Sequence, residues 1–306
     1  MKSDTFTFVA EDGTKIFVHL WFPENIKAVC QIAHGMAEHS ARYERFARKL
    51  VDAGYAVYAN DHRGHGKTAG EVKNLGYFAD KNGWDLVVQD MHQLTEIIKE
   101  NHKDIPVFLI GHSMGSLLSL DYLSRFGNDL KGALLSAPPE NPGFLGNLGI
   151  LLAKLECWTK GRKTASPLLD KLTFGSLNKA FKPNRTDFDW LSRDDTEVDK
   201  YIGDHFCGTI FTAGFFVDLL TGVKKVNDAK TIASIPKDLS IYLIAGDKDP
   251  VVNDTKGIVQ IKTALEKAEV ADINLTLYPE ARHEMLNEIN RKEVYRDIVA
   301  WLEKVS

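Results

Sequence analysis

A serine between two glycines is the residue of this chain best placed to act as a nucleophile. The peptide Gly111-His112-Ser113-Met114-Gly115 follows the apolar run Val107–Ile110 and precedes an apolar segment with helical spacing. This is the G-x-S-x-G pattern in the strand–turn–helix context of a nucleophile elbow. The turn is strained and tightly packed, so a Cβ at either glycine would collide with neighbouring backbone. The sequence therefore predicts that Ser113 stands at the carboxyl end of a strand, at the positive end of a helix.

A serine hydroxyl is a weak nucleophile at neutral pH and needs a histidine base, which a carboxylate must orient. His283 follows the apolar run Leu275–Tyr278, and two aspartates, Asp247 and Asp249, follow the run Leu239–Ala245. Nucleophile-elbow enzymes carry serine, acid and histidine in this order along the chain. Because each group follows the end of a separate strand, the three can converge at one edge of a parallel sheet.

Two backbone amides are predicted to stabilise the oxyanion of a tetrahedral intermediate. One is the amide of Met114, directly after the serine. The other is that of Met36, because His34-Gly35-Met36 ends the apolar run Ala28–Ala33. Gly35 would let the backbone approach a substrate, and we predict that His34, Gly35 and His112 contact it.

A second histidine-rich loop, Asp61-His62-Arg63-Gly64-His65-Gly66, carries side chains of metal-ligand type. We interpret it as a charged, glycine-bent loop at the rim of the site, because no matching cluster and no cysteine pair accompany it. His283-Glu284 does not begin a zinc-binding H-E-x-x-H, since residue 287 is Asn. Neither a dinucleotide fingerprint nor a phosphate loop is present, so no metal and no cofactor are expected.

Composition and charge narrow the class of protein. The 306 residues include 38 Lys and Arg against 42 Asp and Glu, so the chain lacks the basic excess that nucleic-acid binding requires. Residues 1–20 alternate polar and apolar side chains, unlike a secretory signal or a membrane span. Cys30, Cys157 and Cys207 are odd in number and widely spaced, which argues against a disulfide framework and a zinc cluster. The sequence predicts a cytoplasmic protein with free thiols.

Short apolar runs alternate with segments of helical spacing, which predicts an α/β protein with a mostly parallel, doubly wound sheet. An Asp-Gly turn predicts an antiparallel hairpin at the N-terminus, from 5–8 and 15–22. The further strands, all expected to be buried on both faces, are 28–34, 55–60, 107–111, 133–136, 239–245 and 275–278. The expected helices are 43–53, 84–102, 113–126, 258–268 and a last one that carries apolar residues from 294 to 305.

One connection, residues 137–238, is far too long for a single crossover helix. We therefore predict a core made of residues 1–138 and 232–306 and a helical cap over 139–231. Its apolar residues either pack the cap onto the core or line a lid for an acyl chain. On the second interpretation Phe144, Leu148 and Phe215 contact the chain, and the apolar stretch 143–153, too short to span a membrane, touches a membrane surface transiently.

Taken together, several motifs resemble one branch of the α/β-hydrolases, the monoacylglycerol lipases and lysophospholipases, also described as serine aminopeptidases. The resemblance spans 27–137 and 239–305, and its motifs are 34–40 with Arg42-Tyr43, 61–66, 111–115, 246–249 and the loop that ends in His283. It implies the α/β-hydrolase fold and a triad of Ser113, Asp249 and His283, with Asp249 preferred to Asp247. It also implies an oxyanion hole from the amides of Met36 and Met114, and a cap that admits an acyl chain.

The leading hypothesis is a cofactor-free serine hydrolase that cleaves monoacylglycerols or lysophospholipids through an acyl-Ser113 intermediate. A small-acyl or aryl carboxylesterase would use the same triad, as would an aminopeptidase, which would need an acidic pocket for the amine from residues such as Glu140, Asp187 and Asp189. A haloalkane dehalogenase or epoxide hydrolase is disfavoured, because those enzymes carry a carboxylate at the serine position. A catalytically silent acyl-binding protein is the non-enzyme alternative, although no triad residue is missing.

Overall fold

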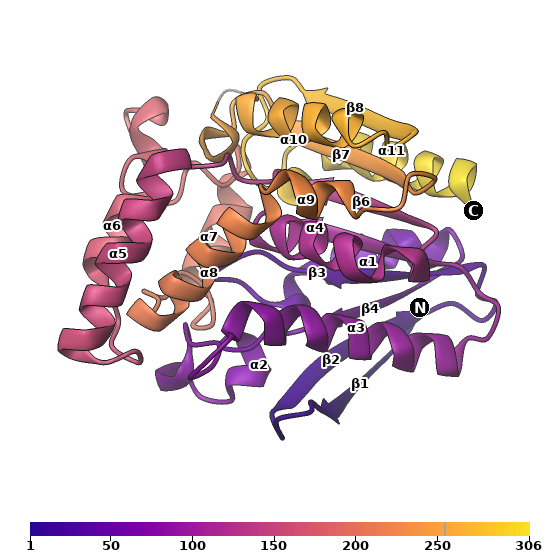
Figure 1. Ribbon diagram of the computed structural model, residues 1–306. Helices are drawn as coiled ribbons and strands as arrows, with labels where there is room; N and C mark the ends of the chain where they lie inside the picture. Colours follow the sequence, from indigo (N-terminus) through magenta and orange to yellow (C-terminus); the bar gives the residue numbers. More distant parts are fainter. Residues whose placement is uncertain (254) are drawn as a thin grey trace.

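The computed structural model describes residues 1–253 and 255–306 and builds them around an eight-stranded sheet (Figure 1). The strand order is β1-β2-β4-β3-β5-β6-β7-β8. β1 and β2 form an antiparallel hairpin, β2 also pairs antiparallel with β4, and every pairing from β4 onwards is parallel. The strands are β1 (Lys2–Val9), β2 (Lys15–Phe22), β3 (Ala28–Ala33), β4 (Tyr55–Asn60), β5 (Val107–His112), β6 (Gly132–Ser136), β7 (Ser240–Gly246) and β8 (Asp272–Tyr278).

Helices cover both faces of the sheet, because the central strands are apolar on both sides. α1 and α11 pack on one face around Phe46, Ile298 and Leu302, and α3, α4 and α10 pack on the other around Met91, Leu118 and Ile258 (Figure 1). The helices are α1 (Glu44–Asp52), α2 (Gly66–Ala69), α3 (Gly83–Asn101), α4 (Met114–Phe126), α5 (Gly143–Lys160), α6 (Pro167–Phe174), α7 (Asp195–Gly203), α8 (Ala213–Val226), α9 (Ala229–Ala233), α10 (Lys256–Lys267) and α11 (Arg291–Val305).

The architecture predicted from the sequence, a parallel doubly wound sheet with an antiparallel hairpin, is confirmed. Every expected strand and helix is present, with ends that differ by a few residues. One detail is wrong: β8 is not buried on both faces, since six of its seven residues are at least partly exposed. β8 lies at the edge of the sheet, and an edge position follows from strand order, which the apolar pattern of one strand does not encode.

The long connection between β6 and β7 contains α5 to α9. α5 and α6 lie beside the sheet at the left of Figure 1, whereas α8 packs against α3 and α4 as well as α5. α8 thus links the projecting helices to the core. The division into a core and a cap over 139–231 stays a prediction. In the part of the chain that the structure describes, no helix is both long and apolar enough to cross a membrane.

Candidate active site

Ser113 lies at the sharp turn between β5 and α4, with φ of 53° and ψ of −118°. Its amide donates a hydrogen bond to the carbonyl of Ser136 at the end of β6, at 2.8 Å. The turn is possible because its glycines lack side chains: a Cβ on Gly115 would lie 2.0 Å from the carbonyl oxygen of Ala33, and one on Gly111 would lie 2.5 Å from that of Gly115. This close packing, expected from the sequence, presses the start of α4 against the end of β3.

The structure brings Ser113, His283 and Asp249 together. Nε2 of His283 lies 2.9 Å from Oγ of Ser113, and Nδ1 lies 2.8 Å from Oδ2 of Asp249. A carboxylate can only accept, so Nδ1 carries the proton and Nε2 is free to accept the proton of the serine. Asp247, the competing acid, instead accepts the amide of Glu280 at 2.7 Å.

Burial gives the pair of His283 and Asp249 its electrostatic character. Both side chains are almost completely buried, and the second oxygen of Asp249 accepts the amide of Val251 at 2.8 Å. Desolvation alone would lower the pKa of His283, but the charge and the hydrogen bond of Asp249 outweigh it, so the pKa is raised above 6.5. The histidine is therefore a stronger base than a free imidazole.

The two predicted oxyanion donors belong to the residue that follows the serine and to a loop that packs against the serine. The amide of Met114 belongs to the first turn of α4, where amides have no acceptor within the helix. A Cβ added to Gly35 would lie 3.4 Å from Cβ of Ser113, so the loop that carries Met36 touches the nucleophile. This arrangement can place two amides around one oxygen bound at Ser113.

The two histidines predicted to contact substrate are buried beside these groups. His34 accepts the amide of His62 at Nε2, at 2.9 Å, so its Nδ1 donates to the carbonyl of Gly35 at 2.7 Å. One ring nitrogen thus holds the backbone of the oxyanion loop, and the other holds the backbone of the loop 61–66. The ring of His112 lies 4.9 Å from that of His283, and desolvation lowers the pKa of His112 to about 4.

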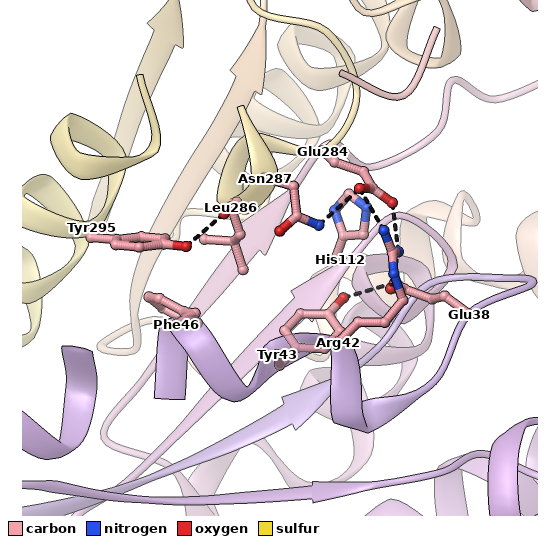
Figure 2. Close-up of a pocket in the computed structure, with 9 residues that line it drawn as sticks. All are labelled: Glu38, Arg42, Tyr43, Phe46, His112, Glu284, Leu286, Asn287 and Tyr295. Carbon is pink, nitrogen blue, oxygen red and sulfur yellow. Dashed lines mark hydrogen bonds and ion pairs between the residues drawn. The ribbon is translucent and has the colours of Figure 1, made fainter. Parts of the chain in front are cut away.

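An ionic network, which the sequence did not indicate, connects the oxyanion loop after β3 to the loop that carries His283 (Figure 2). Arg42 donates to both oxygens of Glu284, at 2.6 and 2.8 Å, and to Oε2 of Glu38 at 2.8 Å. The other oxygen of Glu38 accepts the amide of Gly35 at 2.6 Å and the hydroxyl of Tyr43 at 2.8 Å. The network therefore ties the oxyanion loop to the residue that follows His283.

These groups line a small cleft together with the following residues: Phe46, His112, Leu286, Asn287 and Tyr295. Burial opposes the ionisation of Glu38, but the charge of Arg42 dominates and lowers the pKa of Glu38 to about 2. Glu38 is thus charged at neutral pH, and the guanidinium of Arg42 lies between it and Glu284.

A second neighbour of the site comes from the connection between β6 and β7. The ring of Trp190 lies 5.2 Å from that of His283, and its carbonyl accepts the amide of His283 at 3.4 Å. No pattern around Trp190 marks it in the sequence, because the two residues are 93 positions apart and only the folded chain joins them.

The three predicted acyl contacts lie in different surroundings. Phe144 and Leu148 are on the exposed face of α5, with 73% and 47% of their surface accessible. Phe215, on α8, is completely buried, and its ring lies 4.3 Å from that of Phe211 and 4.7 Å from that of Phe78. The structure thus places Phe144 and Leu148 at the surface and Phe215 in the hydrophobic core.

The loop 61–66 uses its polar side chains to hold the fold near the site. Asp61 accepts the amide of Ser40 at 2.8 Å, and Arg63 forms buried hydrogen bonds to both oxygens of Asp90. The rings of His62 and His65 pack against the ring of His34, at 4.2 and 5.0 Å.

The chain is similar to known proteins over most of its length. The model of the family described as "Serine aminopeptidase, S33" matches residues 24–290. The chain belongs to this family. As a member of the serine aminopeptidase family it is a serine hydrolase with the α/β-hydrolase fold, and the resemblance to the branch of the monoacylglycerol lipases is confirmed.

Relatives of this serine aminopeptidase family member match it over nearly its whole length. A monoglyceride lipase of Mus musculus is 29% identical over 96% of this chain and 88% of its own. A monoacylglycerol lipase of Mycolicibacterium smegmatis is 26% identical over 97% of this chain and 95% of its own. The crystal structure of a thermostable carboxyl esterase from Bacillus coagulans superposes with a TM-score of 0.92 at 26% identity, covering 100% of this chain and 99% of the esterase.

Proposed function

We propose that the protein is a carboxylic ester hydrolase that acts on monoacylglycerols or lysophospholipids through an acyl-Ser113 intermediate. The observation that carries the proposal is the contact of 2.9 Å between Nε2 of His283 and Oγ of Ser113, with Nδ1 held by the buried Asp249. The relatives named monoglyceride lipase and carboxyl esterase support an ester as the substrate.

The proposed mechanism begins when Oγ of Ser113 attacks the ester carbonyl and His283 takes its proton. Asp249 stabilises the imidazolium, and the amides of Met36 and Met114 stabilise the oxyanion. His283 then gives the proton to the leaving alcohol as the intermediate collapses to the acyl-enzyme. In the second half a water attacks the acyl carbon and gives a proton to His283. His283 then returns this proton to Oγ of Ser113 as the bond between Oγ and the acyl carbon breaks, which releases the carboxylic acid.

The raised pKa of His283 predicts where activity is lost in acid. The base must be neutral, so kcat/KM falls as the pH drops through the pKa of His283, which lies above 6.5. We expect the midpoint of the acidic limb above pH 6.5, measured with a soluble p-nitrophenyl ester. His112, with a pKa of about 4, does not titrate in this range. A midpoint clearly below 6.5 would show that Asp249 does not raise the basicity of the histidine.

The substrate class is tested with a ladder of p-nitrophenyl esters from acetate to palmitate, alongside 1-monoacylglycerol and lysophosphatidylcholine. We expect a preference for medium or long acyl chains. We also expect release of glycerol from the monoacylglycerol or of glycerophosphocholine from the lysophosphatidylcholine. In that case Phe215 forms part of the wall of the acyl site, and Phe144 and Leu148 lie at its mouth. Activity confined to acetate or butyrate would exclude the lipase proposal and make the protein a small-ester carboxylesterase.

The family's description raises an aminopeptidase as the second candidate. It would need carboxylates to hold the amine of a peptide. Of the three that the sequence offers in the cap, Asp189 is already engaged by the amides of Arg185 and Thr186 and by the hydroxyl of Thr186. Because Asp189 already accepts these hydrogen bonds, an ester is favoured over a peptide as the substrate. Cleavage of aminoacyl p-nitroanilides faster than any ester of the ladder would instead favour the aminopeptidase.

A membrane surface is the proposed source of a lipid substrate. Large apolar side chains are exposed along one side of α5, which projects from the body at the left of Figure 1. They are Phe144, Leu145, Leu148, Leu151, Leu155 and Trp158. Exposed apolar stripes of this kind, with basic residues nearby such as Lys154 and Lys160, are typical of helices that lie in a membrane interface.

We expect the double variant Leu151→Ser/Trp158→Ser to bind liposomes of phosphatidylcholine and phosphatidylglycerol at least ~10-fold more weakly, since each lost side chain removes apolar area that the membrane would bury. Co-sedimentation measures the bound fraction. Val259→Ser, on α10, is the matched control, because Val259 is also an exposed apolar side chain, with 44% accessible, but lies outside the proposed cap. Equal binding of the double variant and the control would exclude α5 as the contact.

We also propose a cytoplasmic location. It is supported by the three cysteines, which are free thiols in the structure and fit a reducing compartment.

A further inference from the structure

Three potential metal ligands meet where the loop after β3 touches the segment between α7 and α8. A ring nitrogen of His39, a carboxylate oxygen of Asp204 and Sγ of Cys207 all lie within 4.8 Å of one another. His39 comes from the oxyanion loop, four residues after Gly35, and the other two follow α7. None of these side chains belongs to the proposed triad.

Hydrogen bonds already hold the three groups in place. Nε2 of His39 lies 2.8 Å from Oδ2 of Asp204, and the other oxygen of Asp204 accepts the amide of Phe206 at 2.9 Å. The amide of Cys207 donates to the carbonyl of Asp204 at 2.9 Å, and that of Gly208 donates to the carbonyl of Ala37 at 3.1 Å. The last bond joins the two segments directly, so a metal would bind to an arrangement that exists before it arrives.

The charges around the thiol favour a cation. Burial raises the pKa of the Cys207 thiol, and the charged side chains that affect it most are Arg42, which is positive, and Asp204, Glu38 and Glu284, which are negative. Arg42 is itself paired with both glutamates. The surroundings therefore carry an excess of negative charge, which a divalent ion would balance.

We propose that His39, Asp204 and Cys207 bind one zinc ion, with a fourth position left for water. Imidazole, carboxylate and thiolate are all zinc ligands, and the thiolate selects a borderline-soft ion over magnesium or calcium. Zinc–ligand bonds of about 2.0–2.3 Å place tetrahedral ligand atoms roughly 3.3–3.8 Å apart. His39 and Asp204 therefore separate slightly as the ion replaces their hydrogen bond, and the proton of Cys207 passes to solvent as the Zn–S bond forms.

The odd number and wide spacing of the cysteines argue only against a zinc site that several cysteines share. The proposed site uses a single cysteine, and its histidine lies 165 residues before its aspartate, so no spacing rule detects it.

The proposed zinc site lies next to the oxyanion loop, so bound zinc is expected to affect ester hydrolysis. It would fix the segment after α7 to the loop that carries Met36, next to Glu38, which holds the amide of Gly35. This part of the inference rests on the proposed function: we expect bound zinc to slow ester hydrolysis by holding the two segments closed. Metal binding itself does not depend on that function.

Cobalt(II) tests the site without reference to activity, because a cobalt–thiolate bond absorbs in the near ultraviolet by charge transfer. We expect the full chain, freed of metal with a chelator, to bind one Co²⁺ with this absorption, and Zn²⁺ to displace it. Cys207→Ser should abolish the absorption and weaken zinc by about 100-fold or more, beyond the 10–100-fold effect of losing an outer partner. Asp204→Asn, which keeps an oxygen for His39, should also weaken it.

Cys157→Ser is the matched control, because it removes another partly buried thiol, on α5. It should keep the cobalt absorption and the rise in melting temperature that zinc produces in the parent protein. Absence of the absorption in the parent protein, or its loss in Cys157→Ser and not in Cys207→Ser, would overturn the proposal. Zinc that binds at the site while ester hydrolysis continues unchanged would remove the regulatory consequence and leave the binding site intact.

Discussion

Replacing Ser113 by Ala is expected to lower kcat by about 10⁴–10⁶-fold while the protein stays folded. The reason is that Oγ of Ser113 is the atom that the paired His283 and Asp249 activate, at 2.9 Å from the imidazole. Hydrolysis of the best p-nitrophenyl ester measures the loss. Circular dichroism and the urea midpoint should match the parent protein, because the substitution removes only Oγ and its hydrogen bond to His283.

A fluorophosphonate probe separates an activated serine from a structural one. It should label the parent protein stoichiometrically and leave Ser113→Ala unlabelled. Ser116→Ala is the matched control, because the hydroxyl of Ser116, in the first turn of α4, donates to the carbonyls of Gly111 and Ser136 and so shapes the elbow without bonding His283. An active Ser113→Ala variant, or one that still takes the probe, would refute the proposed mechanism.

The parts of the site that local patterns encode could be predicted from the sequence. The elbow around Ser113 is a contiguous peptide whose glycines, strand and helix are all visible in one stretch. The loops of Asp249 and His283 could be placed because each follows an apolar run, and parallel strands bring their carboxyl ends to one edge. The strands and helices of the sheet could be predicted as well, because apolar runs alternate with segments of helical spacing along the chain.

The other features of the site could not be predicted, because they depend on contacts between side chains that are far apart in the sequence and buried together in the fold. Glu284 and Arg42 are 242 residues apart, and charged side chains in loops are usually solvated, so nothing in the sequence indicates that the two are buried together. The contacts of His34 also join distant segments, since its Nε2 accepts the amide of His62, 28 residues later in the chain. The exposure of β8 likewise depends on its place at the edge of the sheet.

The network around Arg42 predicts the second large effect. Arg42→Leu should lower the free energy of unfolding by about 3–5 kcal/mol, because it leaves Glu38 and Glu284 as buried carboxylates without a counter-charge. Both side chains are at most 6% exposed, so water cannot replace the guanidinium. Urea denaturation followed by fluorescence measures the change. In the same helix region Arg48 pairs with Glu44, each 57% exposed, so the matched variant Arg48→Leu should cost about 1 kcal/mol or less.

Activity should fall as well in Arg42→Leu, and for a reason distinct from stability. Glu38 holds the amide of Gly35 and Glu284 directly follows His283, so repulsion between the two carboxylates displaces the oxyanion loop and the base in opposite directions. A misplacement of about 1 Å costs on the order of 10²-fold in rate, so we expect kcat to fall by about that factor at temperatures where the variant is fully folded. Glu284→Gln keeps an oxygen for Arg42 and removes one negative charge, so it should retain most of the activity. If Arg42→Leu were destabilised but fully active, the network would stabilise the fold without positioning the catalytic groups.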